Sequence, residues 1–170
     1  MKKLFVVMAL VSMNFAGYCQ VRPTADTLPT YVRAGIIPEF TGYKAPDSTL
    51  FTKSGIQKNK PVLLMIFSPD CGHCQHMTTE ITDNITHFRK TQIVMVTWLP
   101  YGEMATFYKT YKIADYNEIK MVWDPKYFFL PYYHVQSYPK LIVYDKKGHF
   151  VKEFSGNIQI EEVWKAMGKD

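Results

Sequence analysis

A continuous apolar run, PVLLMIF at Pro61–Phe67, constrains the fold more than any other feature of the sequence. A strand that is apolar at every position has to be covered on both faces, as in a sheet with helices on each side. QIVMVTWL at residues 92–99 predicts a second buried strand. With 170 residues and 47% apolar content, the chain is large enough to bury such a sheet within one domain.

The segments between these runs have helical spacing. A helix is predicted from Cys71 to about Lys90, with a buried stripe made of Cys74, Met77, Ile81, Ile85 and Phe88. Residues 102–113 predict a second helix, whose apolar face consists of Met104, Phe107, Tyr108 and Tyr111. A short strand at residues 119–123 ends at Asp124, a natural cap, and Pro125 suits the first position of a helix. Pro131 must keep that helix brief, because proline breaks a helix interior.

The remaining segments complete an α/β pattern. Residues 139–156 predict a hairpin that turns at residues 145–148, with Phe150, Lys152 and Phe154 on one side of its second strand. A last helix begins near Asn157 and buries Ile160, Val163, Trp164 and Met167. Lys44–Lys60 predicts a small hairpin or cap before the first core strand. The order predicts a central mixed sheet flanked by helices on both faces.

The first 19 residues have the three parts of a secretory signal. Two lysines at positions 2 and 3 precede an apolar run over residues 4–15, and Gly17 and Cys19 occupy the −3 and −1 positions of a cut before Gln20. The run is shorter than the roughly 20 residues that span a bilayer. We expect an exported chain without a stable membrane span, an extended lead-in over residues 20–36 and one domain over residues 37–170. Tyr18, directly ahead of Cys19, disfavours lipidation of that cysteine without excluding it.

The charge of the chain is mildly basic. The net charge is +5, and loss of residues 1–19 would remove two lysines and leave +3. This is too small an excess to indicate nucleic-acid binding, so no nucleic-acid partner is expected.

A Cys-Gly-His-Cys sequence at residues 71–74 follows the first core strand. A helix that starts at Cys71 directs free backbone N–H groups and its positive dipole end at that sulfur, which favours thiolate over thiol. His73 is a second stabiliser when it is protonated. Cys74, one turn along and facing inward, is placed to attack a mixed disulfide formed by Cys71. A bond between them would close a very short loop and add little stability, so the pair indicates redox chemistry.

Taken together, the strand, the CGHC sequence at a helix start and the downstream SYPKLIVYDKKGHFVKEFSG resemble a thioredoxin-fold protein. The Gly-His pair is similar to the active sites of protein disulfide isomerases. APDSTLF before the core strand and MVWDPKYFFLPYYHV before SYPKL resemble the exported TlpA-like thiol-disulfide oxidoreductases of bacterial envelopes. This resemblance covers about residues 37–168. It implies disulfide exchange with protein substrates, a membrane or periplasmic redox partner, a periplasmic location and no cofactor.

The resemblance also assigns residues around the cysteines. It implies that Pro139 is the cis-proline that faces them, and that the backbone at Ser137 and Tyr138 pairs with an extended substrate segment. Two departures concern the proton of the second cysteine. Met65 stands where thioredoxins carry a buried Asp, and Met77 stands where TlpA-like reductases often carry a Glu. In their place His73, His76, Glu80 or water must accept the proton of Cys74.

Two other classes of function stay open at this point. A zinc site needs four ligands, and Cys71, Cys74 and His76 would supply three of them. A copper or other metal chaperone on the same fold would be feasible if His134 approached the cysteines. A substrate-binding module with weak redox activity is the third class. Aromatic residues before the predicted hairpin belong either to the core or to a peptide-binding rim; they are Trp123, Tyr127, Phe128, Phe129, Tyr132, Tyr133 and Tyr138.

Overall fold

A computed structural model describes residues 28–168, so the predicted signal sequence and the start of the predicted lead-in lie outside the described residues. Its seven strands form one mixed sheet in the order β2-β1-β5-β4-β3-β6-β7. The strands are β1 (Thr41–Lys44), β2 (Leu50–Thr52), β3 (Val62–Ile66), β4 (Gln92–Thr97), β5 (Ile119–Trp123), β6 (Lys140–Tyr144) and β7 (Phe150–Ser155). The central strands β3, β4 and β5 are parallel, and β6 runs antiparallel to β3.

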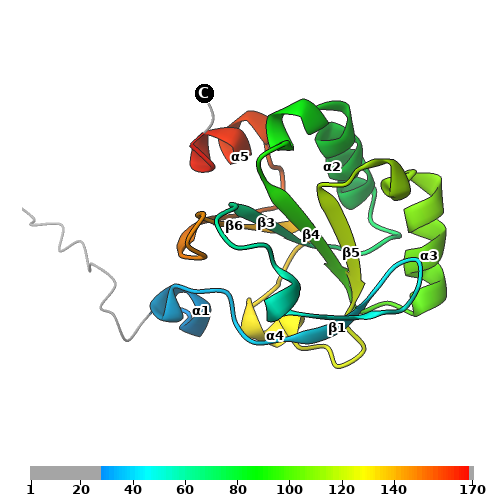
Figure 1. Ribbon diagram of the computed structural model, residues 1–170, viewed down its shortest axis with the longest axis horizontal. Helices are drawn as coiled ribbons and strands as arrows, with labels where there is room; N and C mark the ends of the chain where they lie inside the picture. The colour runs from blue at the N-terminus through cyan, green and yellow to red at the C-terminus, as the bar shows by residue number, and fades with distance from the viewer. Residues whose placement is uncertain (1–27, 169–170) are drawn as a thin grey trace, which may run out of the picture.

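Helices cover both faces of this sheet (Figure 1). On one face lie α2 (Gly72–Asp83), α3 (Tyr101–Thr110) and α5 (Ile160–Ala166), and on the other lie α1 (Thr30–Ala34) and α4 (Phe129–Tyr132). Short 3-10 turns occur at η2 (Lys53–Gly55), η3 (Ile85–Phe88) and η4 (Ile113–Asp115). The predicted α/β fold is therefore confirmed. Within residues 28–168, no helix is both long enough and apolar enough to cross a membrane.

Strand β3 shows why its sequence is apolar throughout. Leu63 and Met65 pack into the core under α2, α3 and α5, whereas Leu64 and Ile66 pack into the core under α1 and α4. Every residue of β3 is buried. Successive side chains point to opposite faces, so a strand between two helical layers needs an apolar residue at each position.

The helix predicted from Cys71 to Lys90 is shorter than expected. It ends at Asp83 and is followed by the separate turn η3. Asn84 stands at the break, where both its backbone N–H and its side-chain Nδ2 donate to the carbonyl oxygen of Glu80, at 3.2 and 2.9 Å. Asparagine side chains compete in this way with helical hydrogen bonds, so the break has a local cause.

The prediction of an extended lead-in over residues 20–36 is wrong where the structure describes it. Residues 30–34 form α1, which ends at Gly35 in the left-handed conformation (φ 63°). Tyr31 is 1% exposed and packs in the core of the second face. Its hydroxyl donates to Glu153, and Lys140 Nζ donates to it at 3.2 Å, so α1 is attached to the domain.

Two local predictions in the C-terminal half also need correction. The brief helix begins at Phe129 rather than at Pro125, because Tyr127 adopts a positive φ and the buried Asp124 carboxylate accepts the N–H of Phe129 at 2.9 Å. Phe150 and Phe154 do not lie on one side of β7. An irregularity in the pairing of β6 with β7 shifts the register, so these two side chains pack in opposite cores.

Candidate active site

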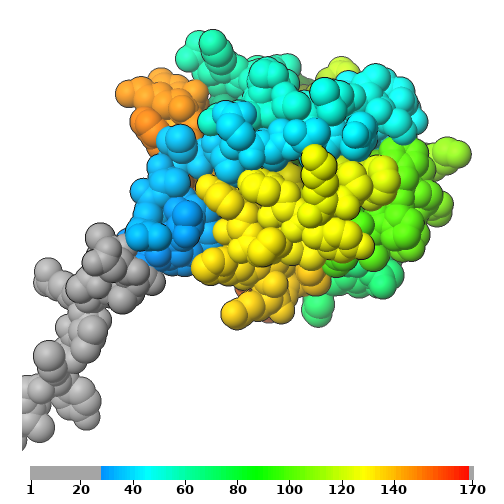
Figure 2. All heavy atoms as spheres, turned by 90° about the horizontal axis from the view of Figure 1, so that it is seen from below, coloured from blue at the N-terminus to red at the C-terminus, as the bar shows by residue number. Residues whose placement is uncertain are grey.

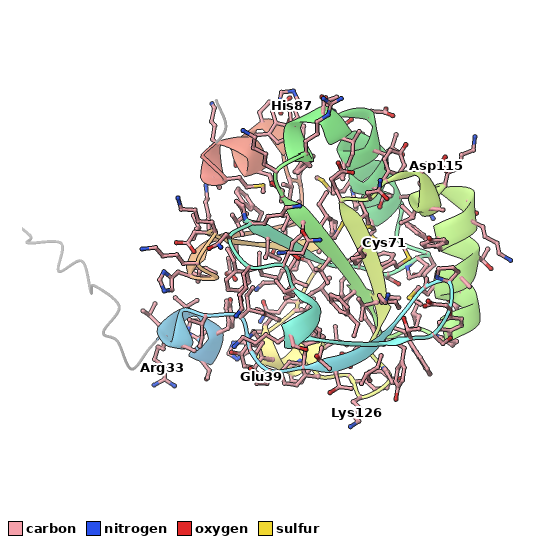
Figure 3. All side chains as sticks on the ribbon, viewed as in Figure 1. Arg33, Glu39, Cys71, His87, Asp115 and Lys126 are labelled. Atoms are coloured by element: carbon pink, nitrogen blue, oxygen red, sulfur yellow. The ribbon has the colours of Figure 1, made fainter. Side chains whose placement is uncertain are left out.

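The cysteine pair lies where β3 passes into α2. Cys71 is the N-cap of α2, and the N–H of Gln75 donates to its carbonyl oxygen at 3.0 Å in the first helical bond. Figure 3 labels Cys71 at the lower end of α2 in that view. Cys71 is partly exposed, whereas Cys74, one turn further, is fully buried, and both carry free thiols. The structure therefore provides the one accessible and one inaccessible sulfur that the sequence predicted.

The surroundings of Cys74 are almost entirely apolar. Its side chain belongs to the core cluster that also holds Met65 and Met77, which are 0% and 3% exposed. Burial is the main reason why the pKa of the Cys74 thiol is raised far above its ordinary range, and the neighbouring Cys71 and Asp70 raise it further. The proton is therefore held tightly on this sulfur until a base approaches.

The loop before β6 lies beside the first cysteine. Because Ile66 at the end of β3 pairs with Lys140 at the start of β6, the residues before Lys140 are brought to the start of α2. The Tyr138 carbonyl oxygen lies 3.9 Å from Cys71 Sγ, and the Tyr138–Pro139 peptide bond is cis. Pro139 is buried and Ser137 is exposed. Of the three residues assigned from the resemblance, Tyr138 thus lies beside Cys71, and Ser137 and Pro139 flank it in the chain.

Trp98 is a site residue that the sequence did not single out. It follows β4, and its ring stacks on Tyr138 with the centroids 4.8 Å apart and an interplanar angle of 29°. Both rings are partly exposed. The carboxyl ends of parallel strands in an open α/β sheet gather the functional loops, and this rule could have placed Trp98 beside the cysteines.

Asp70, directly before Cys71, is a second residue that the sequence reasoning missed. Its side chain is exposed, and its carboxylate accepts a hydrogen bond from the Ser68 hydroxyl. It therefore places an exposed negative charge directly before Cys71.

The candidate acceptors for the proton of Cys74 lie on the outer side of α2. His73 and His76 are exposed, and His76 Nε2 lies 4.0 Å from Glu80 Oε1, which is partly exposed. Cys74 is on the buried side of the same helix, facing the core. The exposed His73 and His76 and the buried Cys74 sulfur therefore lie on different sides of α2.

His134 lies in a different environment from the cysteines. It is exposed, and its ring meets Tyr31 edge-on with the centroids 5.9 Å apart, on the face of the sheet that carries α1. Among the described residues, no group of three or more His, Cys, Asp or Glu side chains could hold a metal ion.

The aromatic residues before β6 divide between core and surface. Phe129 and Tyr133 are buried, whereas Tyr127 is 55% exposed and Tyr132 is partly exposed. Figure 2 shows this segment in yellow, covering the middle of one face between α1 and the β1–β2 hairpin. Tyr138 is the member of the set that lies beside Cys71.

The sheet order and the cysteine pair at the start of α2 define a thioredoxin-like architecture. A family model described as a thioredoxin-like domain matches residues 52–169, so the protein belongs to that family. No curated protein matches the chain.

Several solved structures have the same fold. An exposed lipoprotein thioredoxin of Streptococcus pneumoniae is 23% identical, with 76% of this chain and 100% of that chain covered and a TM-score of 0.58. A secreted disulfide oxidoreductase of Mycobacterium tuberculosis, described as homologous to E. coli DsbE, is 17% identical, with 75% and 92% covered and a TM-score of 0.62. A putative protein disulfide isomerase from Bacteroides thetaiotaomicron is also 17% identical, with 77% and 83% covered and a TM-score of 0.63. At these identities the likeness concerns the fold alone.

Proposed function

We propose that the protein is an exported thiol-disulfide oxidoreductase that exchanges disulfides with protein substrates through Cys71 and Cys74. The observation that carries this proposal is the pairing of a partly exposed Cys71 at a helix N-cap with a fully buried Cys74 one turn away. Dithiol exchange needs one sulfur that a substrate can reach and a second that only the first can reach.

The reaction follows from these positions. The Cys71 thiolate attacks one sulfur of a substrate disulfide, a mixed disulfide forms, and the other substrate sulfur leaves as a thiolate that takes up a proton. Cys74 then loses its proton and attacks Cys71 Sγ. The second substrate thiol is released, the substrate gains two electrons, and a Cys71–Cys74 disulfide remains. The same steps in reverse oxidise a substrate dithiol.

The slow part of this cycle is the deprotonation of Cys74. Its pKa is raised by burial, and methionines occupy both places where related proteins carry an acid. We assign the proton to water or to the departing substrate thiolate, because that thiolate is produced beside Cys71 and is itself a base. His73, His76 and Glu80 remain alternatives that single substitutions can test.

The loop before β6 is the proposed docking strand for substrate. The backbone of Ser137 and Tyr138 precedes the cis Pro139 and lies within reach of a chain that is bonded to Cys71. An extended segment can pair with such an edge through main-chain hydrogen bonds. The stacked rings of Trp98 and Tyr138 add an apolar surface at the same place.

His73 is the proposed tuner of the redox potential. It is exposed in the first turn of α2, beside Cys71, and its protonated form would stabilise the thiolate. Asp70, which directly precedes Cys71, carries a negative charge and therefore disfavours the Cys71 thiolate. We propose that the redox potential of the Cys71–Cys74 pair lies above that of thioredoxin.

Export and a redox partner complete the proposal. The sequence of residues 1–19 supports export to the bacterial envelope, and a membrane or periplasmic protein would then return the dithiol to its working state. No cofactor is needed, since the electrons pass between sulfur atoms.

A copper or other metal chaperone is the alternative function. The two candidate functions are distinguished by assaying the purified, reduced protein for disulfide exchange with hydroxyethyl disulfide and for bound metal. We expect exchange that is lost in Cys71→Ser, with no stoichiometric metal. Stoichiometric copper or zinc together with no exchange would overturn the proposed function.

A further inference from the structure

A groove of about 520 Å³ lies between the start of α2 and α3, and its lining includes Asp70, the residue directly before Cys71. Its α2 side is formed by Pro69, Asp70 and Gln75, the residues that flank the cysteine in sequence and in the first helical turn. Its α3 side includes Glu103 and Phe107. Because Asp70 precedes Cys71 and the N–H of Gln75 donates to the Cys71 carbonyl oxygen, a substrate side chain a few residues from the reacting cysteine can reach this groove.

The polar groups of the groove are mostly acceptors. The hydroxyls of Thr106 and Thr110 donate to carbonyl oxygens one turn earlier in α3, at 2.9 and 3.0 Å. Gln75 Nε2 donates to the carbonyl oxygen of Pro69 at 2.9 Å. Both threonine hydroxyl protons and one of the two amide protons of Gln75 are thus bonded within the protein, while the other Gln75 proton and the Tyr111 hydroxyl are side-chain donors that the groove still offers.

The charges of the groove are negative and uncompensated. Asp70 and Glu103 contribute carboxylates, and among the lining residues, which all belong to the described part of the chain, there is no Lys, Arg or His. Neither carboxylate forms an ion pair with a cation of residues 28–168. The chain as a whole carries +5, so this groove has the opposite sign to the rest of the protein.

The groove also has an aromatic side. Phe107 and Tyr111 line it, with their rings stacked at a centroid distance of 4.3 Å and an interplanar angle of 26°. Arginine and lysine combine an aliphatic stem, which packs on aromatic rings, with a cationic head that donates only. Acceptors, negative charge and aromatic surface together match this one kind of side chain.

We propose that this groove selects substrates that carry an Arg or Lys close to the reacting cysteine. The inference rests on the proposed function and names its substrate class. The basic side chain lies along Phe107 and Tyr111 and places its charge near Asp70 and Glu103, while the substrate sulfur meets Cys71. The contribution is that of partly exposed ion pairs, so selectivity of roughly three- to fivefold is expected.

The test uses peptide pairs in which one cysteine forms a mixed disulfide with 2-mercaptoethanol. The members of a pair are identical except for Arg or Gln two residues from the cysteine, on its N-terminal or its C-terminal side. The second-order rate constant with reduced protein is measured for each peptide at low and at high salt. We expect the Arg peptide of at least one pair to react roughly three- to fivefold faster at low salt, and the advantage to shrink at high salt.

Two variants show whether the groove causes the preference. Glu103→Gln should bring the Arg-to-Gln rate ratio close to one. Glu161→Gln, the same chemical change at an exposed position of α5 outside the groove, should leave the ratio unchanged. Equal rates for Arg and Gln peptides in the wild type, or the same loss in both variants, would overturn the groove proposal while disulfide exchange itself stands. Absence of exchange with every peptide and with hydroxyethyl disulfide would overturn the proposed function, and the groove proposal with it.

Discussion

The burial of Cys74 predicts a specific loss of stability at alkaline pH. The perturbation is a rise in pH applied to the Cys71→Ser variant, with Cys71→Ser/Cys74→Ala as the matched control. Tyrosines whose pKa values are also raised, such as Tyr31 and Tyr133, are present in both proteins and cancel in the comparison. The difference between the two free energies of unfolding therefore reports on the thiol of Cys74.

The sign and size follow from proton linkage. Burial raises the pKa of Cys74 in the folded protein, whereas an unfolded thiol titrates near about 8.5. Stability from the buried thiol is complete below that value and falls as pH rises towards the folded pKa, because the unfolded chain gives up its proton first. The slope approaches about 1.4 kcal/mol per pH unit above pH 8.5, and the total loss between pH 7 and pH 10 amounts to about 2 kcal/mol.

Guanidinium chloride unfolding at several pH values between 7 and 10 provides the measurement. We expect the variant that retains Cys74 to lose about 2 kcal/mol relative to the control by pH 10. A difference that does not change with pH would refute the reasoning, because it would mean that Cys74 titrates alike in both states and is open to solvent.

Three further predictions concern the bridge, the potential and the buried ion pair. Reduction of the Cys71–Cys74 bond should barely change the melting temperature, since the closed loop is very short; a large drop in a thermal scan would make the bridge structural. The redox potential is measured by glutathione equilibration and thiol trapping, and it should lie close to that of protein disulfide isomerase, about −180 mV, rather than that of thioredoxin, about −270 mV. The His73→Pro variant should have a lower, more reducing potential than the wild type. A wild-type potential at or below that of thioredoxin would show that His73 does not tune it. Glu153→Ala should lower the free energy of unfolding by roughly 2–3 kcal/mol in chemical denaturation, because it leaves the charge of Lys140 without its carboxylate partner. The Lys140 side chain is 6% exposed, and its Nζ lies 3.0 Å from Glu153 Oε2. Lys140→Met should lower the free energy of unfolding by less, because the Glu153 side chain is 37% exposed and water can hydrate its charge. A larger loss in Lys140→Met than in Glu153→Ala would contradict this reasoning.

The strand that is covered on both faces of the sheet and the spacing of the two cysteines were the easiest features to predict. The run over Pro61–Phe67 indicated a central strand because it is short, as strands are, and a strand covered on both faces takes an apolar side chain at every position. The pairing of Cys71 and Cys74 followed from helical spacing, which places residues one turn apart whatever the rest of the fold does. These features depend on local sequence alone.

The errors arose where a side chain bonds to distant or unexpected backbone. Asn84 ends α2 through bonds to the Glu80 carbonyl, and Asp124 binds the N–H of Phe129 rather than starting a helix at Pro125. Nothing in the local pattern distinguishes these uses of Asn and Asp from ordinary caps and turns.

The site residues that were missed depend on tertiary contacts. Trp98 follows β4, and it reaches Tyr138 because the sheet order brings the ends of β4, β3 and β6 together. The acidic groove joins Asp70 to Glu103 across two helices that are separate in sequence. Only the arrangement of strands and helices shows that such residues share one surface.

The roles of the two sulfurs are tested most directly by trapping. Cys74→Ser and Cys71→Ser are each incubated with a disulfide-containing protein substrate, and mixed disulfides are separated on non-reducing gels and located by mass spectrometry. We expect Cys74→Ser to accumulate a mixed disulfide through Cys71, since the nucleophile is present and the buried resolving thiol is gone. Trapping through Cys74 in Cys71→Ser, with none in Cys74→Ser, would show that the roles of the two sulfurs are reversed.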